Sequence, residues 1–184
     1  GMILAAEYAR LNNIPYLGLC LGMQVMIIEW CRNVLNLFQA DSEEFVPDTP
    51  NPVIHVMPDQ IDVTNKGGTM RLGVYPCNLD KTSKSYHLYA EDSVEERHRH
   101  RFELNNSYRE AMEESGICFS GLSPDGTLVE IAESSLHDFM IGVQFHPEFR
   151  SRPNSPHPLF VGFLDSVKQM LREGAQFSFN EAET

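Results

Sequence analysis

Positively charged residues are scarce in this sequence, and their scarcity argues against partners that carry many negative charges. Lys and Arg number 14 against 26 Asp and Glu, which gives a formal net charge of −12. A surface of this sign repels the phosphates of nucleic acids and of anionic lipids. We therefore expect no nucleic-acid partner and no binding to a membrane.

Paired cysteines, long apolar runs and a secretory leader are also lacking. The chain has no Cys-x-x-Cys pair and no dense cysteine framework, which favours a reducing compartment over a secreted disulfide scaffold. No apolar run approaches the roughly 20 residues that a membrane-spanning helix needs. The apolar start is soon interrupted by Glu7 and Arg10, which does not fit a signal peptide. These features predict a cytoplasmic protein.

The sequence does contain the material for one α/β domain. Its 184 residues are 42% hydrophobic and include 11 Phe and 6 Tyr, enough to bury a core. Helical periodicity alternates with short apolar runs, which predicts an open, mostly parallel sheet flanked by helices. We expect this domain at residues 1–174 and a frayed tail at 175–184. The expected helices are 4–12, 22–38, one capped at Ser107 and closed by Gly116, and 159–171; the expected strands are 14–19, 53–56, 117–122, 127–133 and 139–145.

The sharpest local motif is Gly18-Leu19-Cys20-Leu21-Gly22, which follows an apolar strand and opens a helix. A nucleophile between two such glycines is typical of a strand-to-helix elbow that exposes its side chain. The positive end of the helix dipole also favours the thiolate of Cys20. The alternative is a small buried cysteine that only fills the core.

A second motif, His146-Pro147-Glu148, follows the apolar run 139–145. In extended backbone, residues two apart project to the same side, so His146 and Glu148 are expected to touch. A carboxylate beside an imidazole fixes its tautomer and raises its basicity, as in a catalytic triad. The alternative is a surface histidine at a strand end, capped by a neighbouring acid.

These two motifs together resemble the class I glutamine amidotransferases, whose glutaminase domain carries a Cys-His-Glu triad. The resemblance assigns the catalytic roles to Cys20, His146 and Glu148, and it implies that family's α/β fold. The segments 67–73 and 96–105 narrow the resemblance to the glutaminase domain of the CTP synthase family, which supplies ammonia for the amination of UTP to CTP.

The resemblance also implies a pocket for L-glutamine. A zwitterion needs one anion and one cation in its pocket, and these roles fall on Glu44 and Arg101. The nucleophile helix adds contacts from Leu21, Gly22, Met23 and Gln24, with the backbone N–H of Leu21 as one oxyanion donor. The second donor belongs to an upstream glycine-rich loop that this sequence does not include, so we expect labelling of Cys20 to exceed turnover.

The resemblance places the family's other ligands outside this chain. The chain has no Gly-x-x-x-x-Gly-Lys-Ser/Thr phosphate loop, so no cofactor is expected on it. The resemblance implies an amidoligase domain of the same parent chain that binds ATP, UTP and magnesium. It also implies GTP as an activator, with Arg71 in the glycine-rich segment 67–73 as a candidate regulatory residue.

Four other interpretations remain open. The Arg/His run 97–101 could be a solvated basic segment, or in isolation a nucleic-acid patch. No metal site is predicted, because His98 and His100 lie two apart without nearby cysteines. The chain could also serve another class I amidotransferase, or be a non-catalytic module of the same fold that binds a partner.

Overall fold

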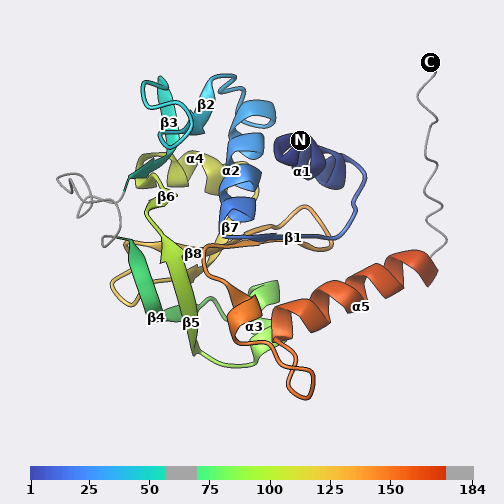
Figure 1. The fold of residues 1–184 in the computed structure, drawn as a ribbon. Helices are drawn as coiled ribbons and strands as arrows, with labels where there is room; N and C mark the ends of the chain where they lie inside the picture. Colours follow the sequence, from blue (N-terminus) through green and yellow to red (C-terminus); the bar gives the residue numbers. More distant parts are fainter. Residues whose placement is uncertain (57–69, 173–184) are drawn as a thin grey trace.

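The computed structural model describes residues 1–56 and 70–172, so the predicted tail at 175–184 lies outside the described residues. Helices and strands are interspersed along the chain, but they do not strictly alternate as the sequence predicts, because strands also follow one another directly, as at residues 117–143 (Figure 1). The helices are α1 (Met2–Leu11), α2 (Leu21–Asn33), α3 (Lys84–Tyr89), α4 (Arg109–Glu114) and α5 (Pro158–Arg172), with short 3-10 turns η2 (Asn106–Tyr108) and η3 (Pro147–Phe149). The strands are β1 (Tyr16–Leu19), β2 (Ala40–Ser42), β3 (Asn51–Val56), β4 (Arg71–Leu79), β5 (Ser93–His100), β6 (Phe102–Leu104), β7 (Ile117–Leu122), β8 (Val129–Ser134) and β9 (Met140–Val143).

The described strands of the main sheet run in the order β1-β9-β8-β7-β4-β5. Only β1 and β9 pair in parallel, and the other neighbours in this sheet are antiparallel. The prediction of a mostly parallel sheet is therefore wrong for the described residues. The prediction rested on apolar strands such as β9, which is buried at every position. Helices on both faces of a sheet bury its central strands in either direction, so burial does not indicate direction.

A smaller sheet of order β2-β3-β6 stands beside the first. Its β3 pairs in parallel with β2 and antiparallel with β6. Arg101 is the single residue between the end of β5 in the large sheet and the start of β6 in the small one. The chain thus passes from one sheet to the other at the residue predicted to bind a carboxylate.

Helices cover both faces of the large sheet (Figure 1). On one face, α1, α2 and α4 lie over a core that includes Met26, Trp30 and Met112. On the other, α3 and α5 lie over a core that includes Ile141 and Leu159. None of the described helices has the length and apolar character to cross a membrane.

Helices α2 and α4 have boundaries that differ from the sequence prediction. The second helix ends at Asn33 and not at residue 38. The predicted cap at Ser107 is wrong: the side chain of Asn105 accepts a hydrogen bond from the backbone N–H of Ser107, and the α-helix begins at Arg109. Asn and Ser are both good caps, so composition alone does not distinguish these two positions.

The turn from β1 into α2 depends on close backbone packing. A Cβ on Gly18 would lie 2.6 Å from the backbone carbon of Gly22, so no side chain fits there. The Tyr16 hydroxyl donates a 2.7 Å hydrogen bond to the Gly22 carbonyl oxygen and holds the turn closed. A Cβ on Gly22 itself would meet nothing nearer than that hydroxyl, at 3.8 Å. Of the two glycines, only Gly18 is therefore required by sterics.

This difference predicts opposite effects of two alanine substitutions. Gly18→Ala forces β1 and α2 apart and is expected to cost about 1–3 kcal/mol of unfolding free energy, as overpacking usually does. Gly22→Ala removes a helical glycine without a clash and is expected to be neutral or slightly stabilising. Urea denaturation of the two variants measures both effects, and equal destabilisation would refute the steric argument.

Candidate active site

Cys20 occupies the tip of the turn between β1 and α2. Its backbone has φ 49° and ψ −101°, a conformation that non-glycine residues rarely adopt. Its N–H donates a 2.7 Å hydrogen bond to the carbonyl oxygen of Val143 at the end of β9. Strained backbone held by its surroundings is common where a reactive side chain must be presented. The predicted strand-to-helix elbow is therefore confirmed.

The helix N-terminus does favour the thiolate, through the backbone N–H of Leu21, but other effects on the pKa of Cys20 outweigh it. Burial is the largest effect and raises the pKa of Cys20 above its usual value. Hydrogen bonds from the N–H of Leu21 and from Gln144 lower that pKa, while the carboxylates of Glu148 and Glu44 raise it further. Because the opposing effects leave the pKa raised, the resting side chain is a thiol. Nucleophilic attack by Cys20 therefore needs a base.

Gln144 belongs to the site, although the sequence analysis did not select it. Its Nε2 lies 3.6 Å from Cys20 Sγ, and its Oε1 accepts a 3.2 Å hydrogen bond from Gln24 Nε2. Gln24 also donates to the carbonyl oxygen of Phe102, at 3.0 Å. The signal in the sequence is a glutamine inside the otherwise apolar run 139–145, two positions before His146, and the structure buries its side chain.

His146 and Glu148 are in contact, as predicted. His146 Nδ1 lies 2.7 Å from Glu148 Oε1, which leaves Nε2 for other partners. The reason given from the sequence is wrong, because Glu148 lies in the 3-10 turn η3 and not in extended backbone. His146 N–H donates to the carbonyl oxygen of Arg97, at 2.8 Å, which fixes this segment against β5.

The predicted triad is only partly assembled in the described structure. Cys20 and His146 follow the carboxyl ends of the neighbouring parallel strands β1 and β9, so both lie at the same edge of the sheet. No hydrogen bond joins them among the residues that the structure describes. Such bonds are often long without substrate and tighten when it binds.

A cavity of about 350 Å³ opens at Cys20 and brings together most of the predicted pocket. Both residues predicted to bind the charges of glutamine line it, although they are 57 positions apart in the sequence. Gly22 and Met23 do not line it, and Met23 is buried in the core against β9. The lining residues are Cys20, Leu21, Gln24, Glu44, Phe45, Met70, Arg99, His100, Arg101 and Phe102.

Residues 97–100 of the Arg/His run lie in the alternating strand β5, where the two histidines are buried and the two arginines are exposed. His98 Nδ1 and His100 Nε2 lie 3.0 Å apart, and burial lowers the pKa of both rings, to about 2 and about 4. The alternative of a solvated basic segment is therefore correct for the exposed Arg97 and Arg99 and wrong for the buried His98 and His100. Within residues 1–56 and 70–172, no three His, Cys, Asp or Glu side chains gather as metal ligands.

Arg71 does not lie in a glycine-rich loop. It is the first residue of β4, and its side chain is buried in a 2.6 Å ion pair with Glu130. Burial raises the pKa of Glu130 to about 7, although Arg71 acts in the opposite direction. Glycines 67 and 68 lie outside the described residues. The structure therefore places Arg71 as a buried ion-pair residue.

The chain is highly similar to parts of known enzymes. It is 58% identical over 176 residues to the CTP synthase of Dehalococcoides mccartyi, covering 96% of this chain and 32% of that protein. It is 61% identical over 167 residues to the CTP synthase of Microcystis aeruginosa, covering 91% and 31%. The chain thus spans about a third of the length of these curated relatives.

A solved structure shares the fold, and this chain covers a larger share of it than of the curated relatives. The glutaminase domain of Trypanosoma brucei CTPS with bound acivicin superposes with a TM-score of 0.85 at 38% identity, covering 91% of this chain and 65% of that one. The family profile described as "Glutamine amidotransferase class-I" matches residues 1–166. The resemblance read from the two motifs is confirmed: this chain belongs to the class I glutamine amidotransferase family.

Proposed function

We propose that this chain is the glutaminase portion of a CTP synthase and releases ammonia from L-glutamine. The observation that carries the proposal is one cavity that holds a strained, half-buried cysteine together with Glu44 and Arg101. Its high identity to CTP synthases favours this enzyme over another amidotransferase with the same triad. A binding module of the same fold would have no need for a strained cysteine.

Charge matching supports the orientation of the substrate. Arg101 presents a guanidinium that suits the α-carboxylate of glutamine, and Glu44 presents a carboxylate that suits its α-ammonium. Both line the same cavity as Cys20. Binding of the charged end by these two groups directs the carboxamide of the substrate toward Cys20.

In the proposed reaction, Cys20 Sγ attacks the carboxamide carbon while His146 accepts the thiol proton. Glu148 holds His146 Nδ1 and so directs Nε2 to this task. The N–H of Leu21 donates to the developing oxyanion. His146 then gives its proton to the departing nitrogen, the C–N bond breaks, and ammonia leaves a γ-glutamyl thioester on Cys20.

Water completes the cycle. His146 takes a proton from the water, which attacks the thioester carbon. The C–S bond then breaks and His146 returns the proton to the leaving sulfur, which gives glutamate and the Cys20 thiol. The remaining two thirds of the relatives' length is proposed to be an amidoligase domain that uses ATP and magnesium to aminate UTP in the cytoplasm.

We further propose that GTP activates the enzyme. The Arg71 side chain is buried against Glu130 and Tyr75, so any role of Arg71 in that response would be indirect.

Ammonia release tests the proposed activity. Cys20→Ala removes the nucleophile and is expected to abolish glutamine-dependent ammonia production to background. Cys118→Ala is the matched control, because Cys118 is also a partly buried free cysteine but does not line the cavity. An enzyme-coupled ammonia assay distinguishes them, and full activity in Cys20→Ala would disprove the proposal.

Substrate affinity tests the two charge partners. Glu44→Gln and Arg101→Gln each leave one charge of glutamine unpaired and are expected to raise KM by more than about tenfold, since such losses typically cost 2–5 kcal/mol. Arg99→Gln is the comparison, because Arg99 lines the same cavity without an assigned role. A KM effect at Arg99 and none at Arg101 would transfer the carboxylate site to Arg99.

The pH dependence of thiol alkylation tests the electrostatics of Cys20. Loss of the Gln144 hydrogen bond in Gln144→Leu raises the pKa of Cys20 further, so labelling by a small neutral reagent is expected to need higher pH. Glu44→Gln removes a nearby negative charge, which lowers that pKa and shifts the profile to lower pH. Rate–pH profiles of both variants check the two signs, and shifts in the same direction would contradict the account.

A further inference from the structure

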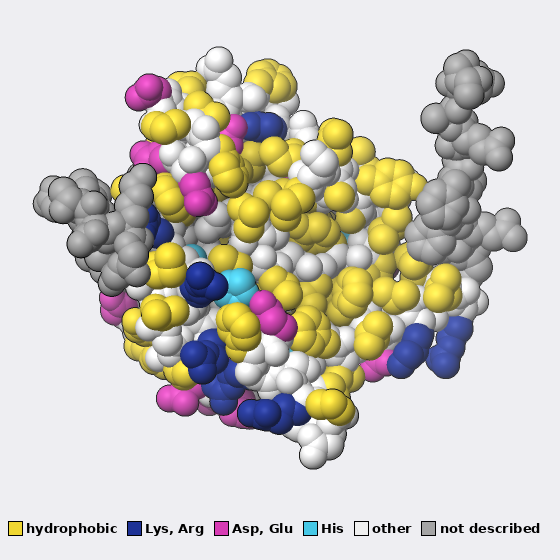
Figure 2. All heavy atoms as spheres, viewed as in Figure 1, with side chains coloured by type: hydrophobic (Ala, Val, Ile, Leu, Met, Phe, Trp, Pro, Cys, Tyr) yellow, Lys and Arg dark blue, Asp and Glu magenta, His cyan; other side chains and the backbone are white. Residues whose placement is uncertain are grey.

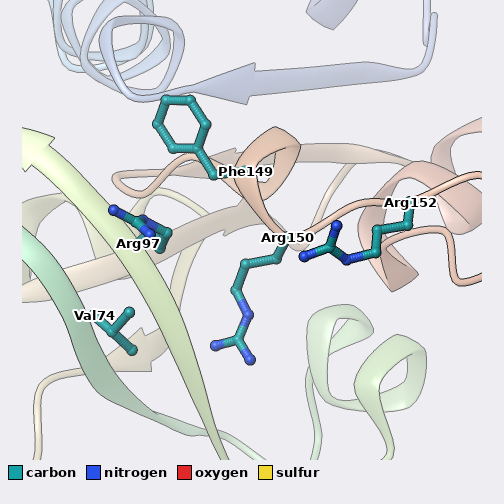
Figure 3. A pocket seen from close by; sticks show the side chains of 5 residues that line it. All are labelled: Val74, Arg97, Phe149, Arg150 and Arg152. Carbon is teal, nitrogen blue, oxygen red and sulfur yellow. The ribbon is translucent and has the colours of Figure 1, made fainter.

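Two buried histidines of β5, His98 and His100, have no part in the proposed reaction, although His100 lines the cavity at Cys20. The arginines of this strand point the other way. Figure 3 shows Arg97 at a separate cavity of about 310 Å³, together with Val74 of β4. Lys and Arg side chains gather on the surface over β5 (Figure 2). The two histidines face the interior, so their partners are buried groups.

The hydrogen bonds of the two rings determine where their protons lie. His100 Nδ1 lies 3.1 Å from the carbonyl oxygen of Phe102, which can only accept, so Nδ1 carries a proton. Burial lowers the pKa of His100 to about 4 and that of His98 to about 2, so both rings are neutral at pH 7. His100 Nε2 is then an acceptor, and His98 Nδ1, 3.0 Å away, donates to it. The rings of Tyr75 and Phe145 pack edge-on against His98, at centroid distances of 5.6 and 5.8 Å, and hold it in place.

The Phe102 carbonyl oxygen also determines how two amides are turned. Gln24 Nε2 donates to it at 3.0 Å and to Gln144 Oε1 at 3.2 Å. Gln144 Oε1 is thereby turned toward Gln24, which leaves Gln144 Nε2 facing Cys20 Sγ at 3.6 Å. In the opposite orientation a carbonyl oxygen would face the sulfur and oppose formation of the thiolate. The favourable orientation thus depends on one backbone acceptor.

The hydrogen bond from His100 to Phe102 also spans Arg101. Arg101 is the bend at which the chain passes from the large sheet to the small one, and His100 and Phe102 lie on either side of it. The His100 ring therefore closes the bend from which Arg101 reaches the cavity. One imidazole supports the residue proposed to bind the substrate carboxylate and, through Gln24, the donor to the nucleophile.

We propose that His98 and His100 are positioning residues of the glutaminase site. His98 selects the tautomer of His100 that donates to the Phe102 carbonyl oxygen. That hydrogen bond in turn keeps Arg101 and Gln144 in the orientations that bind glutamine and stabilise the thiolate. The inference rests on the proposed function and deepens it, because it gives a role to two residues that touch neither the reacting sulfur nor its base.

Nitrogen NMR of the imidazole rings tests the tautomers directly. We expect the proton of His100 on Nδ1 in the unsubstituted chain, and a gain of the Nε2–H tautomer in His98→Leu, because the donor to Nε2 is lost. His98→Asn keeps an N–H close to the place of Nδ1 and is expected to restore the original tautomer. A His100 protonated at Nε2 in the unsubstituted chain, or a tautomer that His98→Leu leaves unchanged, overturns the proposal.

His100→Leu is expected to change two measurements together. The L-glutamine concentration that halves the rate of Cys20 alkylation rises by about two- to tenfold, the effect of one net hydrogen bond. The pH–rate profile of alkylation by a small neutral reagent shifts to higher pH, because the Gln144 donor is no longer held toward the sulfur. His100→Asn retains an N–H for the Phe102 carbonyl oxygen and is expected to keep both measurements close to those of the unsubstituted chain.

His137→Leu is the matched control, because His137 is also buried and lies 3.1 Å from a backbone oxygen, that of Ala9, but at the other end of β9. No change in either measurement in His100→Leu, or equal changes in His137→Leu, overturns the proposal. The tautomer of the unsubstituted chain needs no variant, so the test holds even where His100→Leu does not fold. Alkylation of Cys20 that glutamine fails to slow in the unsubstituted chain contradicts the glutaminase function instead, whereas the tautomers and the pH profile are measured without glutamine.

Discussion

The close approach of three backbone segments around Cys20 is the constraint on which the site depends. Gly18 lets the end of β1 touch the first turn of α2, and Gly142 lets Met23 of that helix pack directly on β9. The hydrogen bond from Cys20 N–H to Val143 then fixes the reactive residue against the strand that leads to His146. A side chain at either glycine would separate the nucleophile from its proposed base.

The electrostatics of the site follow from that burial. Desolvation favours the neutral thiol, and the N–H of Leu21 and the amide of Gln144 offset it only in part. A cysteine kept as a thiol is protected from indiscriminate reaction, and it becomes a nucleophile when a base takes its proton. In our proposal, His146 supplies that base, and the neighbouring Glu44 and Arg101 select the substrate before the proton moves.

The elbow and the His146–Glu148 contact were predictable because each is formed by residues that lie within five positions of one another in the sequence. The order and direction of the strands were not, since apolar character reports burial and not pairing. The structural role of Arg71 was not predictable either, because its partner Glu130 lies 59 positions away in the sequence. The glycines around Arg71 suggested a loop, whereas β4 begins there. Gln144 was not predicted, because its side chain is not ionisable and its contribution comes from a hydrogen bond to sulfur. The roles of Glu44 and Arg101 came from family resemblance, and the fold explains why such distant residues can act together.

The most direct test of the central claim is to map the cysteine that reacts with a glutamine-like electrophile, with and without L-glutamine. Our account predicts modification of Cys20 alone, identified by peptide mass spectrometry, and slower modification in the presence of glutamine. It also predicts that the protection is lost in Arg101→Gln. Modification of Cys31, Cys77 or Cys118 in place of Cys20, or labelling of Cys20 that glutamine does not slow, would contradict it.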